Sequence, residues 1–153
     1  MLGKESRKMA YSALEVAKYV INHEHNNGRE ISNLRLQKLL YFVQAKVLVE
    51  TGDPCFDDVM EAWDYGPVVP VVYHKYKIYG SWDIQISDVL VDIEDRIRTF
   101  IDAMLDYCRN YPTYQLVEIT HKQDPWIQAH QRGTKSEIRP SAIKQYFLSK
   151  NSK

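Results

Sequence analysis

Apolar residues recur at the spacing of an α-helix along most of the chain, and glycines and prolines separate the periodic stretches. Ser12 followed by Glu15 has the pattern of a capping box, in which two side chains satisfy free N–H groups at a helix start. Asp124 before Pro125 is a second start signal. Helices are predicted to begin at or near Ser12, Ser32, Pro70, Ile93, Leu116, Asp124 and Arg139.

The helix that begins after Ser32 and ends at Gly52 carries more apolar surface than one stripe requires. Its helically spaced apolar residues are Leu36, Leu39, Leu40, Val43 and Val47, flanked by Leu34, Tyr41 and Leu48. A helix that is apolar on several faces must be covered on several faces. We therefore predict that this helix is central in the fold.

The period changes to two between Val59 and Tyr65, which predicts a short strand. Gly66-Pro67 is expected to end that strand, because proline restricts the residue before it. Residues 82–86 are the expected partner strand. The predicted fold class is mainly α (α+β): a compact helical domain with a small antiparallel strand element around residues 59–65 and 82–86.

The length and charge of the chain narrow its class. A chain of 153 residues suits a single domain, expected over 1–153 with frayed ends at 1–10 and 149–153. Twenty basic residues balance twenty acidic ones, so global charge argues for neither nucleic acid nor membrane. No stretch approaches the ~18 apolar residues of a membrane span, and the first ten residues do not resemble a secretion signal. We expect a cytoplasmic protein.

Local charge is uneven. Five acids and no base lie between Asp53 and Asp64, and six bases against one acid lie between Arg132 and Lys153. A solvated acidic face and a basic tail account for this pattern. The basic tail also offers a phosphate footprint. Its aromatic residues Tyr146 and Phe147 follow a helical pattern, however, which favours packing over nucleic-acid binding.

The His23-Glu24-His25 triplet resembles a metal-binding motif but has the wrong spacing. A zincin places its second histidine four residues after the first, where this chain has Asn27. Residues two apart point in different directions on a helix. We interpret the triplet as a polar helix end, and no metal or cofactor site is predicted.

The sequence evidence for a catalytic site is equally weak. A cysteine nucleophile needs a nearby base, and pairing Cys55 with His74, or Cys108 with His121, has no recognisable local arrangement. His121 and Asp124 could form an acid/base pair, but Asp124 is better explained as a helix cap. We predict a protein that is not an enzyme, with a hydrolase using His121 and Asp124 as the weaker alternative.

One segment, residues 63–73, is aromatic, apolar and stiffened by prolines. Alternating strand faces cannot both point inward in a domain with one sheet, so Trp63 and Tyr65 are candidates for an exposed face. Exposed aromatics on a rigid turn suit a protein-binding hot spot, whereas a turn packed under a helix is the structural alternative. The candidate partner-binding residues are Trp63, Tyr65, Gly66, Pro67 and Tyr73.

Residues 31–80 resemble the Panacea domain, the family of SocA-like antitoxins. The resemblance rests on the order and spacing of three segments: Leu34-Arg35-Leu36-Gln37-Lys38-Leu39-Leu40-Tyr41, Thr51-Gly52-Asp53-Pro54, and Glu61-Ala62-Trp63-Asp64-Tyr65-Gly66-Pro67-Val68-Val69-Pro70. A weaker similarity continues through Asp124-Pro125-Trp126 and 143–147. The resemblance implies a mainly helical antitoxin from bacteria or phages that binds a toxin encoded by a neighbouring gene.

Several functions remain open at this point. The favoured one is neutralisation of a protein toxin by direct binding, with delivery of the toxin to a protease as a variant. The acidic run 53–64 would speed encounter with a basic toxin. A stand-alone interaction module of bacterial or phage origin is the alternative, and exposed aromatics would also permit a homodimer.

Overall fold

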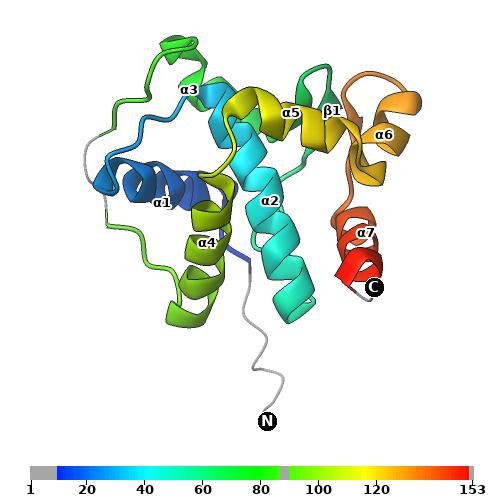
Figure 1. The fold of residues 1–153 in the computed structure, drawn as a ribbon, viewed down its shortest axis with the longest axis horizontal. Coiled ribbons are helices and arrows are strands. Elements are labelled where there is room, and N and C mark those ends of the chain that lie inside the picture. Colours follow the sequence, from blue (N-terminus) through cyan, green and yellow to red (C-terminus); the bar gives the residue numbers. More distant parts are fainter. Residues whose placement is uncertain (1–9, 87–89, 152–153) are drawn as a thin grey trace.

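The computed structural model describes residues 10–86 and 90–151 (Figure 1). This part of the chain forms seven α-helices and one three-stranded antiparallel sheet, which confirms the mainly α fold class. Most residues of the predicted frayed ends, 1–9 and 152–153, lie outside the described residues. The elements in chain order are α1 (Ala13–Asn26), α2 (Asn33–Thr51), β1 (Glu61–Trp63), β2 (Gly66–Val68), α3 (Pro70–Tyr76), the 3-10 helix η2 (Lys77–Tyr79), α4 (Asp95–Cys108), α5 (Thr113–His121), α6 (Asp124–Gln131), β3 (Ser136–Glu137) and α7 (Pro140–Asn151).

Helix α2 is the centre of the fold, as its apolar surface predicted. Figure 1 shows it crossing the molecule, with α1 and α4 on one side and α7 on the other. Helices α3 and α5 and strand β2 also contact it. Every residue from Leu36 to Ala45 is buried. This buried run includes the polar side chains of Gln37, Lys38 and Gln44. Their hydrogen bonds to backbone groups position the neighbouring loops.

The predicted helix starts are present. Ser12 Oγ accepts a hydrogen bond from Glu15 N at 3.1 Å, and Glu15 Oε1 accepts one from Ser12 N at 3.0 Å, so the capping box is confirmed. Ser32 caps α2 through Arg35 N. Helix α6 begins at Asp124, with Pro125 in its first turn, although the cap position falls one residue earlier at Gln123.

The predicted strand is present as β1 and ends before Gly66-Pro67, but the expectation that these two residues break the strand element was wrong. These residues begin β2, which pairs with β1 around a two-residue turn at Asp64-Tyr65, so that Ala62 lies opposite Pro67 and Trp63 opposite Gly66. Pro67 is tolerated because β2 is an edge strand of the order β2-β1-β3. Gly66 supplies the φ of 110° that the turn requires.

The partner strand predicted at residues 82–86 was also wrong. The second partner of β1 is β3 (Ser136–Glu137), which lies far along the chain. The segment after Trp82 is instead anchored by two hydrogen bonds to Ile31: Ile84 N donates to its carbonyl at 2.9 Å, and Asp83 Oδ1 accepts from its N–H at 2.7 Å. Ile84 is buried, but residues 82–86 form no strand.

Candidate protein-binding groove

Polar side chains of α2 hold the loop after the β1–β2 hairpin in place. Gln37 is fully hydrogen-bonded: its Oε1 accepts from Val69 N at 2.8 Å, and its Nε2 donates to Asn33 Oδ1 at 3.0 Å. Asn33 Nδ2 in turn donates to the carbonyl of Tyr73 on α3 at 3.1 Å. All the buried amide groups of this ladder are therefore satisfied, which fixes β2 and α3 against the N-terminal half of α2.

Lys38 lies directly under the hairpin. Its side chain is fully buried, and Nζ donates a hydrogen bond to the carbonyl of Pro67. Burial lowers the pKa of Lys38 to about 7, because the charged ammonium is poorly solvated there. Gly66 packs on the same side chain: a Cβ at this position would lie 3.0 Å from Lys38 Cε and 2.9 Å from Thr120 Oγ1. The close approach explains why glycine stands at this position.

The tip of the hairpin is held from its other side by α5 and α6. Asp64 is the common partner: its carbonyl lies 3.0 Å from His121 Nε2, and its carboxylate Oδ1 lies 3.1 Å from His130 Nε2. Trp126 stands between the two histidines, with ring centroids 4.3 Å from His121 and 4.4 Å from His130. Its indole N–H donates to the carbonyl of Trp63 at 2.8 Å. The hairpin is thus fastened along both of its sides.

An open groove of about 500 Å³ lies beside the hairpin, between the start of α2, α3 and the loop before β3. Figure 1 shows α3, β1 and α5 gathered at this end of α2. The walls are largely apolar: Leu34 and Val68 line the groove together with Trp63, Tyr65 and Tyr73. Trp63 and Tyr73 contact edge to face at a centroid distance of 4.9 Å, whereas the Tyr65 side chain is 70% exposed.

The five candidate residues therefore fall into two groups. Trp63, Tyr65 and Tyr73 line one groove. The sequence could suggest this closeness only for Trp63 and Tyr65, as neighbours on one face of a strand. Gly66 and Pro67 are buried within the hairpin, at the start of β2, where they shape the groove without lining it. The three aromatics thus line the groove, whereas the glycine and the proline set the backbone geometry beside it.

The residues of the catalytic alternatives are engaged elsewhere. Among the described residues no hydrogen bond or ion pair joins His121 to Asp124, because His121 faces Asp64. Both cysteines are buried, and burial raises the pKa of each thiol to about 12. A thiol with so high a pKa is a poor nucleophile at neutral pH.

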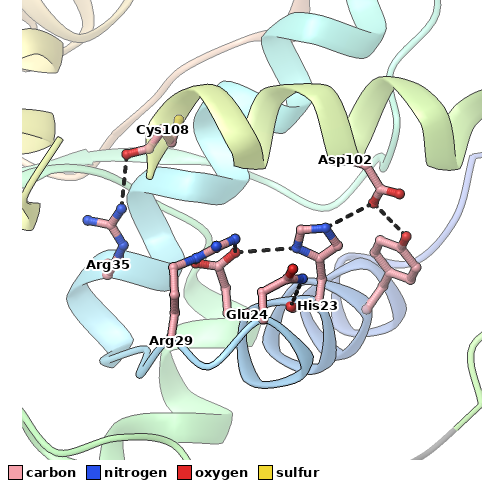
Figure 2. Close-up of polar contacts among 8 residues, drawn as sticks. His23, Glu24, Arg29, Arg35, Asp102 and Cys108 are labelled. Carbon is pink, nitrogen blue, oxygen red and sulfur yellow. Dashed lines mark hydrogen bonds and ion pairs between the residues drawn. The ribbon is translucent and has the colours of Figure 1, made fainter. Parts of the chain in front are cut away.

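Sequence reasoning missed an ion pair between the buried Glu24 of α1 and Arg29 in the loop that follows this helix. Glu24, interpreted as part of a polar helix end, is only 1% exposed and accepts from Arg29 Nε at 3.0 Å and Nη2 at 2.8 Å. Figure 2 shows the imidazole of His23 between Glu24 and Asp102 of α4, at 3.4 Å and 3.6 Å. The hydrogen bonds from His23 and Arg29 lower the pKa of Glu24 to about 2, overcoming its burial. The signal for this ion pair in the sequence was an acidic and a basic residue five positions apart.

The same region fixes the end of α4 against α2. Arg35 Nη2 donates to the carbonyl of Cys108 at 3.1 Å (Figure 2), and its Nη1 donates to the carbonyl of Tyr111 at 3.0 Å. His25 Nε2 lies 3.1 Å from Asp83 Oδ1, so the two histidines of the triplet contact different carboxylates. Among the residues that the structure describes, no helix is long and apolar enough to cross a membrane.

Comparison with known proteins identifies relatives of this chain. The family described as "Antitoxin SocA-like, Panacea domain" matches residues 36–127, a range that contains the five candidate residues. Antitoxin SocA of Caulobacter vibrioides (strain NA1000 / CB15N) is 52% identical over 109 residues, which make up 63% of this chain and 58% of that relative. The similarity therefore spans somewhat more than half of the curated relative. No solved structure matches the chain.

Proposed function

The chain belongs to the SocA-like Panacea antitoxin family, and from this premise we propose that it neutralises a cognate protein toxin by binding it directly. The toxin would be encoded by a neighbouring gene. The observation that carries the proposal is the groove beside the β1–β2 hairpin, where three aromatic side chains converge on an open, largely apolar surface. Tyrosine and tryptophan are the residues that most often dominate binding energy at protein interfaces.

The support beneath the groove favours tight binding. The hairpin is hydrogen-bonded to α2 through Gln37 and Lys38 and to α6 through Trp126. A surface that is already ordered loses little conformational entropy when a partner docks. The chemistry around the groove supports capture of a protein better than turnover of a small substrate, since both histidines near it face Asp64.

A growth assay tests the proposal. The open reading frame beside the gene for this chain is expressed from an inducible promoter, with and without the chain. We expect growth arrest that co-expression relieves. A toxic neighbour whose effect persists beside normal levels of this chain would refute neutralisation. Toxin levels followed by immunoblot in the same cells separate masking, in which the toxin persists, from delivery to a protease, in which it disappears.

We expect Tyr65→Ala to weaken toxin affinity by about tenfold or more, because it removes an aromatic anchor from the centre of the proposed interface. Tyr65 is 70% exposed, so the free energy of unfolding should stay within about 0.5 kcal/mol of wild type. Affinity is measured by calorimetry and stability by urea unfolding.

Tyr114→Ala is the matched control for this substitution. Tyr114 lies on α5, outside the lining of the groove, and is 64% exposed. Its truncation should leave affinity unchanged. Equal losses from the two substitutions would mean that the groove is not where the toxin binds.

A further inference from the structure

The charged side chains that line the groove are Lys77, Lys135 and Asp64, so the lining carries one more positive than negative charge. Lys77 and Lys135 are both exposed, and neither makes an ion pair with any residue in the described ranges. Lys135 Nζ lies 4.5 Å from the centroid of the Trp63 ring, so its charge is held over the aromatic wall. Asp64 is the acidic residue among the described lining residues, and its carboxylate already contacts His130.

Several carboxylates of the acidic run 53–64 make hydrogen bonds within the fold, which leave their negative charge in place. Asp58 Oδ1 accepts a hydrogen bond from Ala13 N at 2.8 Å, at the start of α1. Glu61 Oε1 accepts from the indole N–H of Trp63 at 2.9 Å. With Asp64 bonded to His130, three of the five acids serve the fold itself. Of the described acids in this run, only Asp64 lines the groove, so most of the run's negative charge lies outside it.

From these contacts we infer that the groove takes a segment of the toxin that carries a carboxylate next to an apolar side chain. The inference rests on the proposed function and specifies the partner's chemistry at the same site. The apolar walls of Leu34, Val68 and Tyr65 accommodate the apolar side chain, and Lys77 and Lys135 pair with the carboxylate. The toxin segment is thus expected to be acidic at this site, whereas the acidic run in the sequence suggested a basic toxin.

Desolvation favours a carboxylate in the partner. A partner that covers the groove removes water from the lysines at its rim, and a buried ammonium without an acceptor is costly. A toxin segment without an acid would leave that ammonium unpaired. An acidic segment offsets the desolvation, and its attraction to the lysines also raises the association rate.

The double charge reversal Lys77→Glu with Lys135→Glu tests the inference. We expect toxin affinity to fall by about tenfold or more, mainly through slower association, and its dependence on salt to weaken. The matched control is Arg96→Glu with Lys150→Glu, which changes net charge equally on α4 and α7, away from the groove lining. Stability of both variants is checked by urea unfolding.

Two outcomes separate this inference from the proposed function. In the first, co-expression of wild type relieves toxicity, but the variant with Lys77→Glu and Lys135→Glu binds the toxin as tightly as the control variant. The proposed role of a toxin carboxylate is then refuted, while neutralisation stands. If the Arg96/Lys150 control loses as much affinity, the effect is one of net charge and the inference again fails.

A phage-displayed library of random twelve-residue peptides supplies a probe that needs no toxin. We expect wild-type protein to enrich peptides with Asp or Glu within two positions of an aromatic or aliphatic residue, and the charge-reversed protein to lose that preference. Enrichment without acidic residues would overturn the inference. So would a homodimer of the chain that Tyr65→Ala dissociates, since a second copy would then occupy the groove.

Discussion

We expect Arg29→Met to lower the free energy of unfolding by about 3–5 kcal/mol at pH 7, because it leaves the buried carboxylate of Glu24 without its main partner. Glu24 is 1% exposed, and Arg29 donates the two short hydrogen bonds that the Glu24 carboxylate accepts. What remains is the longer contact to His23, whose Nδ1 lies 3.4 Å from Glu24 Oε2. The change is measured by urea unfolding followed by circular dichroism.

The double variant Glu24→Gln with Arg29→Met separates a stranded charge from lost packing. Since the amide buries no charge, we expect the double variant to be more stable than Arg29→Met alone, in spite of carrying one more substitution. A double variant that is less stable than the single one would show that Arg29 stabilises the fold mainly by packing.

The same pair predicts an acid dependence. The pKa of Glu24 is lowered from 4.5 to about 2 in the folded state, so the stability it contributes is present above pH 4.5 and lost as the pH falls through 2. At 1.36 kcal/mol per unit this amounts to about 3 kcal/mol. Wild type should therefore lose stability between about pH 4.5 and pH 2 that the double variant does not lose. His23 is protonated throughout that range and does not confuse the comparison.

How far the sequence predicts this molecule depends on whether a feature is local. The capping box of Ser12 and Glu15 needs residues three apart, so the sequence sufficed to place the start of α1. The central position of α2 followed from its apolar faces. By contrast, β3 pairs with β1 across more than seventy residues through only Ser136 and Glu137, and no pattern of period two can show in two residues.

The groove was predictable in part, for a related reason. Trp63 and Tyr65 stood out as aromatics on a stiff segment, and the structure places both at the groove with Tyr73. The roles of Lys77 and Lys135 were not predictable, because their proximity depends on how the loop before β3 returns to Trp63. Nor could the sequence show that Asp58 and Glu61 are bonded within the fold. Charge counts along a chain do not reveal which charged side chains line a groove.

We expect Gly66→Ala to lower the free energy of unfolding by about 3 kcal/mol, through backbone strain and a steric clash together. The φ of 110° is unfavourable for any residue with a Cβ. The added methyl would also meet Thr120 Oγ1 at 2.9 Å and Lys38 Cε at 3.0 Å. Lys38 cannot retreat freely, since it is fully buried and donates to Pro67.

Gly28→Ala is the matched control, because Gly28 has a φ of 74° but no atom within 4 Å of the position that an added methyl would take. It should cost only about 1 kcal/mol, from backbone strain alone. The two substitutions should also differ in function. A displaced hairpin moves Trp63 and Tyr65, so Gly66→Ala should weaken toxin affinity at a temperature where it is still folded, whereas Gly28→Ala should not. Equal stability losses would show that the space under the hairpin adjusts freely, and the rigid support proposed for the groove would be wrong.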